Sequence, residues 1–356
     1  MIDSVGSHRL RSRPLLCGYY GEHNLGDDAL LHTVLQQLPS GCEPLVTAAD
    51  QQQVQQLFAV STCDRRSLPA ALLALNRCDA LVFGGGSLLQ DSTSFGSLLY
   101  YGALISEARL QGKPVLLWGQ GLGPLKRRRS RALVRILLSQ VQQASWRDGE
   151  SSRLAIELGR PAGDPIGTDP VWSFPPQPWR GSGGPIVLAW RPTPLLQGRA
   201  WLPLLEALAS LAISQQRELL WLPFHRGQDR GLLSRLHSEG LMPEGLAERS
   251  RELDVSTPQE AMEVAAGAGL LLAMRLHALI LGSLAGAPCA ALSYDPKVAA
   301  AAAGLGCPCV DLAMPTEAPA LLASWLAQLD RPADPMAIQK QVAAAGCHQR
   351  VLAGLL

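Results

Sequence analysis

The chain has 356 residues, of which 47% are hydrophobic and 17% are charged. This length and apolar content favour two domains that each bury a core, and they exclude a small scaffold held together by disulfides. The 31 Lys and Arg residues balance the 30 Asp and Glu residues. No overall field attracts nucleic acid, so we expect no nucleic-acid partner and a local site for any anion.

The eight cysteines form neither a CxxC pair nor the spacing of a secreted disulfide framework. We therefore expect reduced thiols in a cytoplasmic protein. The apolar segment 15–20 is too short for the core of a signal peptide. The longest apolar region, 269–292, is interrupted by Arg275, His277 and Pro288, whereas a membrane span needs about 18 uninterrupted apolar residues. A soluble protein is expected.

Short apolar runs alternate with amphipathic stretches from residue 15 to about residue 172. The predicted strands are 15–18, 45–48, 80–83, 115–118 and 144–146. The predicted helices between them are 29–38, 52–58, 70–76, 98–110 and 131–143. This alternation predicts a parallel sheet that is covered by helices on both faces.

Residues 173–184 contain three prolines and three glycines and are interpreted as a linker. The alternation then restarts. The predicted elements are strands 186–190, 218–222, 269–274, 289–293 and 308–312, with helices including 202–214, 258–266 and 336–355. We therefore expect two α/β, Rossmann-like, doubly wound domains that face a cleft. Their bounds are 1–172 and 185–332, followed by a C-terminal helix within 333–356 that can cross back to the first domain.

Glycine-rich turns follow three predicted strands of the first domain. They are GYYGEHNLGDD (18–28), FGGGSLLQD (83–91) and WGQGLGP (118–124). Glycines at strand ends let the backbone approach a ligand closely, which favours a sugar or glycan. Asp27 or Asp28 can cap the following helix or act on the substrate, and both interpretations stay open. The candidate ligand contacts from these turns are Gly21, Asn24, Gly85, Gly86 and Gln120.

Two further acids and one basic run stand out in the first domain. Asp148 follows a predicted strand, Asp169 belongs to a GTDP turn, and either can be structural. The run Lys126, Arg127, Arg128 and Arg129 is most simply a solvated loop. Its functional alternative is peripheral contact with an anionic lipid surface that holds a lipid-linked acceptor.

Cationic side chains stand at the predicted strand ends of the second domain. They are Arg191, His225, Arg275, His277 and Lys297. On a strand, Arg275 and His277 would point to one face, because residues two apart do so. A fixed cation beside an imidazole suits an anionic substrate that exchanges protons, although a buried Arg with a local carboxylate is the simpler alternative. We expect neither a metal nor a cofactor, because no DxD element or His/Cys cluster is present.

The motifs GYYGEHNLGDDALL, VFGGGSLLQD, GTDP, MRLHALI and SYDPKV occur in this order. In this the chain resembles polysaccharide pyruvyltransferases of the CsaB type. The resemblance covers about residues 16–299. It implies a glycosyltransferase-B-like architecture and transfer of pyruvate from phosphoenolpyruvate to a sugar of a cell-surface glycan or of its lipid-linked precursor, as a cyclic ketal with release of phosphate.

Carried onto this chain, the family's motifs indicate Arg191, Arg275, Leu276 and His277 as ligands of phosphoenolpyruvate. The two arginines could clamp its carboxylate and phosphate. His277 could protonate the methylene carbon. Asp27, Asp28 or Asp148 would then accept the hydroxyl protons of the sugar.

Two other functions remain open. A glycosyltransferase that uses a nucleotide sugar would also need second-domain cations, together with a ribose-binding carboxylate that the sequence does not place. A glycan-binding protein without catalysis would tolerate loss of His277, and the titratable groups at strand ends argue against it. The acceptor sugar and the oligomeric state, including a homo-oligomer, are left open by the sequence.

Overall fold

The computed structural model describes residues 12–92 and 94–356 and divides into two compact units. Unit 1 contains the described chain up to Gly21, together with Val34–Pro170 and Gly346–Leu356. Unit 2 contains Glu22–Thr33 and Val171–Ala345. We expected the first domain to run without interruption to residue 172, but residues 22–33 group with the second unit instead.

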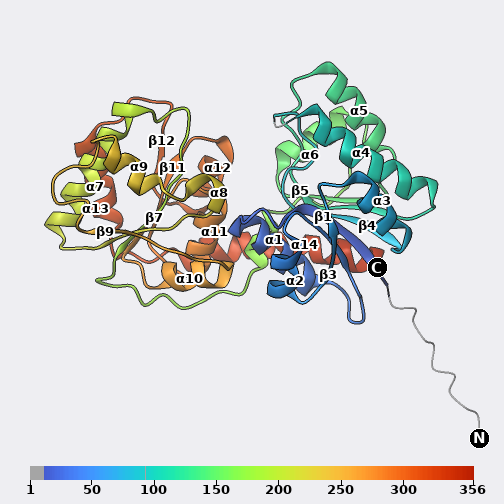
Figure 1. The fold of residues 1–356 in the computed structure, drawn as a ribbon, viewed down its shortest axis with the longest axis horizontal. Coiled ribbons are helices and arrows are strands. Elements are labelled where there is room, and N and C mark those ends of the chain that lie inside the picture. Colours follow the sequence, from blue (N-terminus) through green and yellow to red (C-terminus); the bar gives the residue numbers. More distant parts are fainter. Residues whose placement is uncertain (1–11, 93) are drawn as a thin grey trace, which may run out of the picture. The chain divides into compact units, whose positions relative to one another are not determined.

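Unit 1 is built on a parallel sheet of six strands in the order β3-β2-β1-β4-β5-β6. Figure 1 labels β1, β3, β4 and β5 of this sheet. The strands are β1 (Pro14–Tyr20), β2 (Leu45–Ala48), β3 (Ser61–Asp64), β4 (Ala80–Gly84), β5 (Val115–Gln120) and β6 (Gln143–Trp146). The helices are α1 (Leu25–Gln37, whose first part belongs to unit 2), α2 (Gln51–Phe58), α3 (Leu68–Asn76), α4 (Phe95–Leu110), α5 (Arg128–Leu138) and α6 (Gly149–Glu157). The order reverses between β1 and β4, as in a Rossmann-like fold.

Unit 2 repeats this topology with the strand order β12-β11-β10-β7-β8-β9, again all parallel. Its strands are β7 (Ile186–Ala189), β8 (Leu219–Trp221), β9 (Ser250–Glu252), β10 (Leu270–Ala273), β11 (Cys289–Ser293) and β12 (Cys309–Asp311). Its α-helices are α7 (Leu202–Ser214), α8 (Arg226–Asp229), α9 (Leu232–Ser238), α10 (Pro258–Ala266), α11 (Leu276–Leu284), α12 (Pro296–Leu305) and α13 (Ala318–Gln328). Two 3-10 turns, Pro170–Ser173 and Gly198–Trp201, and the final helix α14 (Pro335–Leu355) complete the fold.

The core of unit 2 fixes the strand ends that carry the cationic side chains. Trp190 directly follows β7 and stacks on Trp201 with 5.9 Å between ring centroids. It also packs edge-on against Trp221 of β8, with 5.6 Å between ring centroids. All three rings are almost fully buried, and aromatic pairs of this kind add rigidity beyond the area they bury. The carboxyl ends of β7 and β8 are therefore fixed by close packing of these rings.

The segment 173–184, which we interpreted as a linker, packs closely on unit 2. The Trp179 indole N–H donates to the Ala268 carbonyl at 2.8 Å, and the Arg180 backbone N–H donates to the Ala266 carbonyl at 2.9 Å. A Cβ at Gly181 would lie 2.3 Å from the Ala268 carbonyl oxygen. The glycines thus permit close backbone packing here, and the segment groups with unit 2.

The last turns of α14, from Gly346 on, belong to unit 1. His348 is fully buried and bonds through Nδ1 to the Ser145 hydroxyl and through Nε2 to the Thr168 carbonyl, both at 2.8 Å. Burial lowers the pKa of this imidazole. Unit 1 is therefore assembled from three separate segments of the chain, and the hydrogen bonds of His348 hold the last of them, Gly346–Leu356, in place.

Within residues 12–92 and 94–356, no helix is long and apolar enough to cross a membrane. The same residues contain no group of three or more His, Cys, Asp or Glu side chains that could hold a metal ion.

Candidate functional site

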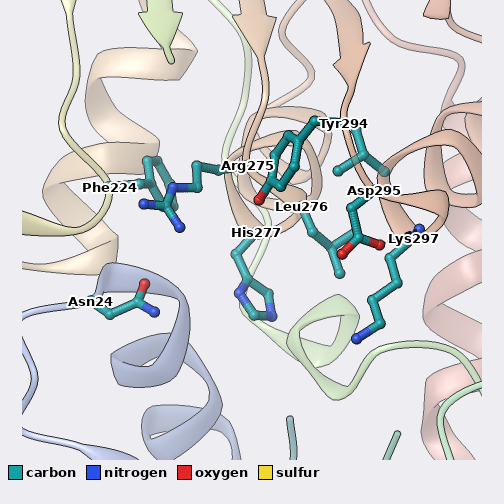
Figure 2. Close-up of a pocket in the computed structure, with 9 residues that line it drawn as sticks. Asn24, Phe224, Arg275, Leu276, His277, Tyr294, Asp295 and Lys297 are labelled. Atoms are coloured by element: carbon teal, nitrogen blue, oxygen red, sulfur yellow. Dashed lines mark hydrogen bonds between the residues drawn. The ribbon is translucent and has the colours of Figure 1, made fainter. Parts of the chain in front are cut away.

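A pocket of about 140 Å³ opens at the carboxyl edge of the unit 2 sheet (Figure 2). Its lining residues come from the segment before α1, from the turns that follow β8, β10 and β11, and from the first turns of α11 and α12: Asn24, Phe224, Arg275, Leu276, His277, Tyr294, Asp295, Lys297 and Val298. All nine belong to unit 2. The strand order of this sheet reverses between β7 and β10, and ligands of doubly wound sheets bind at such reversal points.

Arg275 and His277 both line the pocket, but not as alternate residues of a strand. Strand β10 ends at Ala273, Arg275 is the N-cap of α11, and His277 lies in the first turn of that helix. The shared strand face that we predicted is therefore wrong. Both line the pocket because the chain leaves β10 at Ala273 and enters α11 at Leu276, so Arg275 comes just before the helix and His277 lies in its first turn (Figure 2).

Arg275 is held by a carboxylate that is completely buried. Its Nε donates to Asp229 at 3.0 Å, and its Nη2 donates to the second oxygen of the same carboxylate. The Asp229 side chain is 0% exposed and that of Arg275 is 13% exposed. Nη2 also donates to the Gln228 side chain at 3.1 Å. Among the described residues only Nη1 of Arg275 is left for a ligand, so this arginine presents one nitrogen and not a full fork.

The same carboxylate also fixes the loop after β8. Asp229 accepts the backbone N–H of Phe224 at 3.1 Å and that of His225 at 2.8 Å. This loop in turn carries the segment before α1, since the Leu25 N–H donates to the Phe224 carbonyl at 2.9 Å. Asn24, which lines the pocket, pairs with His225 in a short antiparallel bridge. One buried acid thus positions Arg275, Phe224 and, through the loop, Asn24.

The imidazole of His277 lies against the first turn of α1. A Cβ at Gly26 would be 2.1 Å from His277 Nδ1, closer than any real contact. Asn24 caps this helix by accepting the Gly26 N–H at 3.1 Å, so α1 begins at Leu25, four residues earlier than we predicted. Asn24, and not Asp27 or Asp28, provides this capping bond. The glycine of the NLGDD motif is needed for the approach of His277.

Lys297 and Asp295 complete the pocket from the start of α12. Asp295 caps the helix by accepting the Lys297 backbone N–H at 2.9 Å, so part of its acceptor capacity is already used. The Lys297 ammonium extends toward the side of the pocket on which His277 lies (Figure 2). Arg191 does not line the pocket itself. Its Nη1 donates to the Tyr294 hydroxyl at 3.0 Å, and its guanidinium lies 5.0 Å from that ring.

His225, another predicted ligand, is half-buried and is not among the lining residues. Burial and the charge of Arg275 lower the pKa of its imidazole. Its backbone, through the bridge to Asn24, is what connects it to the pocket.

The candidate residues of unit 1 serve mainly to hold its loops. Gln120 is 1% exposed, and its amide N–H groups bond the Gly85 carbonyl at 2.6 Å and the Phe83 carbonyl at 3.3 Å. The amide that we expected to face a ligand therefore supports the glycine loop. A Cβ at Gly21 would lie 2.7 Å from the Asp50 backbone nitrogen, so this glycine serves backbone packing. Gly85 and Gly86 have positive φ angles of 81° and 75°, which suit glycine.

Arg147 organises the acidic residues at this edge of unit 1. The guanidinium bonds Asp169 at 3.3 Å and the Ser87 hydroxyl at 2.9 Å, and it lies 3.6 Å from Asp148. Asp148 also caps α6 by accepting the Ser151 N–H at 2.7 Å. Asp148 and Asp169 thus both have structural partners, which agrees with the alternative interpretation that these acids are structural.

Asp27 and Asp28 belong to unit 2 and differ sharply in environment. Asp27 accepts a hydrogen bond from the amide of Asn24, a pocket residue. Asp28 is 1% exposed, and neither of its carboxyl oxygens bonds any described residue. Burial and the neighbouring Asp27 raise the pKa of Asp28 to about 8. Asp28 is therefore protonated at neutral pH and is a poor proton acceptor there.

The role of Asp229 is the main feature of the pocket that sequence reasoning missed. The sequence shows only an acidic residue four positions after His225, close to the end of a predicted strand. Its partner Arg275 lies 46 residues further along the chain, so nothing local in the sequence indicates the pairing.

Solved structures with the same fold are numerous. A putative UDP-N-acetylglucosamine 2-epimerase from Listeria monocytogenes matches with a TM-score of 0.64 and 13% identity, over 97% of this chain and 96% of the other. The UDP-GlcNAc 2-epimerase of Methanocaldococcus jannaschii gives 0.65 and 10%, over 97% and 99%. HepE of Anabaena, solved in complex with UDP-glucose, gives 0.56 and 14%, over 96% and 94%. At these identities the likeness shows the fold alone, that of two Rossmann-like domains of the glycosyltransferase-B type.

A search of curated proteins finds no match. The family described as polysaccharide pyruvyl transferase matches residues 24–296. That range begins at Asn24, ends at the first residue of α12, and includes both Arg275 and His277. The chain belongs to the polysaccharide pyruvyl transferase family.

Proposed function

We propose that this protein transfers the pyruvyl group of phosphoenolpyruvate to a sugar of a cell-surface glycan or of its lipid-linked precursor, and forms a cyclic ketal. The observation that carries the proposal is the unit 2 pocket, in which Arg275, His277 and Lys297 meet at the starts of α11 and α12. Its volume of about 140 Å³ is below the range of about 300–1,000 Å³ common for larger ligands. A small, strongly charged donor suits it.

Phosphoenolpyruvate carries two anionic groups, and the pocket offers separate partners for them. The Arg275 side chain makes no capping bond to α11, so the positive end of that helix supports one anion beside Arg275 Nη1. We assign Lys297 to the other anion, with Arg191 in support behind the lining residue Tyr294, whose hydroxyl it bonds. Asp229 balances the charge of Arg275, so the net attraction for the donor comes chiefly from Lys297 and the helix ends.

In the proposed reaction His277 protonates the methylene carbon of the donor, which makes C2 electrophilic. One sugar hydroxyl adds to C2, the C2–O bond to phosphate breaks, and a second hydroxyl closes the ketal. Of the two hydroxyl protons, one balances the proton taken up by the methylene carbon and the other leaves with phosphate. We assign the proton acceptor to Asp27, because it bonds Asn24 in the pocket while Asp28 is protonated.

All eight cysteines are free, and on this ground we propose a reducing compartment such as the cytoplasm.

Calorimetric titration tests the donor. We expect phosphoenolpyruvate to bind wild type and to bind Arg275→Ala at least about tenfold more weakly, since a charge-assisted contact is worth about 1.5–3 kcal/mol. His277→Ala should keep donor binding and lose phosphate release. Selective binding of UDP-glucose or UDP-N-acetylglucosamine, the type of ligand seen in HepE, would instead favour a glycosyltransferase and contradict the proposal.

A further inference from the structure

The loop before α5 and the exposed side of that helix form a strongly cationic surface, which we call the basic face. It comprises Lys126, Arg127, Arg128, Arg129 and Arg135, all exposed. The exposed positions of α5 itself are occupied only by Arg, Ala and Ile, without an acid among them. The chain as a whole carries a formal charge of only +1, so this concentration of charge is a local feature.

Several of these cations lie at the N-terminus of α5, where the helix dipole disfavours positive charge. Arg127 is the N-cap of α5 and makes no side-chain capping bond, and the first turn contains no acid. The N-terminus of a helix carries a partial positive charge, so arginines there repel it. Conflicts between a local rule and the sequence tend to mark functional surfaces. The Asp91 carboxylate, which accepts the Arg127 backbone N–H, offsets part of this repulsion, and an external anionic partner would offset the repulsion among the exposed side chains.

Apolar side chains accompany the cations. Ile136 of α5 is 58% exposed and Leu99 of α4 is 52% exposed. The two helices pack side by side (Figure 1), and the Arg129 guanidinium lies 4.3 Å from the ring centre of Phe95, one turn before Leu99 on α4. Aliphatic and basic side chains are therefore mixed on one surface, which is typical of segments that lie on a lipid interface.

The basic face is anchored to the glycine loop at the carboxyl edge of the unit 1 sheet. Asp91 follows the Gly85-Gly86 turn, and its carboxylate accepts the backbone N–H groups of Lys126 at 3.0 Å and Arg127 at 2.8 Å. These bonds lower the pKa of Asp91, so the anchor stays ionised at neutral pH. The cations are thus held in a fixed position beside the loop and do not belong to a free tail.

We propose that the basic face docks the protein on an anionic lipid surface. Charge complementarity and the exposed Leu99 and Ile136 favour lipid over nucleic acid, which is usually bound by domains with a large overall positive charge. The inference does not depend on the reaction proposed above, because it rests on unit 1 residues outside the pocket.

Co-sedimentation with vesicles tests the docking. We expect binding to vesicles that mix phosphatidylglycerol with phosphatidylcholine and not to phosphatidylcholine alone. In the triple variant Arg128→Gln, Arg129→Gln and Arg135→Gln, binding should weaken about a hundredfold, since each cation near a lipid surface contributes about fivefold. The matched control changes three exposed arginines elsewhere, Arg77→Gln, Arg109→Gln and Arg251→Gln, and should bind like wild type.

Three results would overturn the proposal. They are equal binding to neutral and anionic vesicles, equal losses in the two triple variants, and tighter binding of duplex DNA than of anionic vesicles at the same salt concentration. None of them would affect the assignment of the donor pocket, whose residues both triple variants leave unchanged.

Discussion

At the scale of single residues, Asp229 is the acid on which the pocket depends most. It holds Arg275 through both oxygens and also fixes two backbone N–H groups of the loop after β8. Sequence patterns predicted that Arg275 and His277 would share one space as alternate residues of a strand; both line the pocket, but from the N-cap and the first turn of α11. These patterns could not predict that a buried acid fixes the direction of Arg275, since that depends on tertiary packing.

Asp229→Asn should therefore impair donor binding. An amide cannot accept from all four donors, so Arg275 loses its fixed position, and loss of a charge-assisted contact worth about 1.5–3 kcal/mol weakens binding about ten- to a hundredfold. We expect this loss mainly as a higher KM for phosphoenolpyruvate, measured by phosphate release. Gln228→Ala, which removes one exposed partner of Arg275, should change KM only slightly. A purely structural role would lower the melting temperature and leave the KM of the folded fraction unchanged.

Asp28 should make stability depend on pH. Its pKa in the folded protein is about 8, against an ordinary value of 3.8. Between these two pH values the folded state binds the proton more tightly than the unfolded state. Stability therefore falls as pH rises through this range, by about 1.4 kcal/mol per pH unit for one proton. Urea unfolding of wild type and Asp28→Asn at several pH values should show this slope in wild type alone. Parallel curves would contradict the burial of an unpaired carboxyl group.

At the scale of elements, the sequence predicted strongly patterned segments well and polar edges poorly. Helices 202–214 and 258–266 were predicted at their observed bounds. Strands β3 and β9 were missed, and both lie at sheet edges with few buried side chains. An edge strand needs no continuous apolar run, so its sequences, STCD and SRE, resemble loops. The start of α1 was missed because its second residue is a glycine.

That glycine gives a prediction about α1. Gly26→Ala would place a Cβ 2.1 Å from His277 Nδ1, so the imidazole must move. We expect phosphate release to fall about a hundredfold while phosphoenolpyruvate still binds. Gly96 provides a matched control, because it occupies the same position in the first turn of α4 and a Cβ there meets only the Ser94 hydroxyl at 3.6 Å. Gly96→Ala should leave activity unchanged and stabilise the helix by up to about 1 kcal/mol. Equal activities would show that His277 does not need its present position.

At the scale of the whole molecule, chain connectivity and compact units do not coincide. The segment 22–33 groups with unit 2 although it follows the first strand of unit 1, and the chain returns to unit 1 at Gly346. Alternating patterns predicted two doubly wound sheets, because that signal is local. They could not assign these two short segments to a unit, since only packing decides where such a segment belongs.

His348 should control the stability of unit 1 through this returning segment. Its ring bonds Ser145 and Thr168 and lies 6.1 Å from the Trp118 ring, so His348→Ala removes one buried and one partly buried hydrogen bond and leaves a cavity. We expect a loss of about 2–4 kcal/mol in urea unfolding, while His237→Ala, at an exposed site, should have little effect. Because burial lowers the pKa of His348 in the folded protein below its ordinary value of 6.5, its contribution is complete at neutral pH and is lost as pH falls below that value. Wild type should therefore lose stability on acidification more steeply than His348→Ala, and equal slopes would mean that the imidazole is not held in its neutral form.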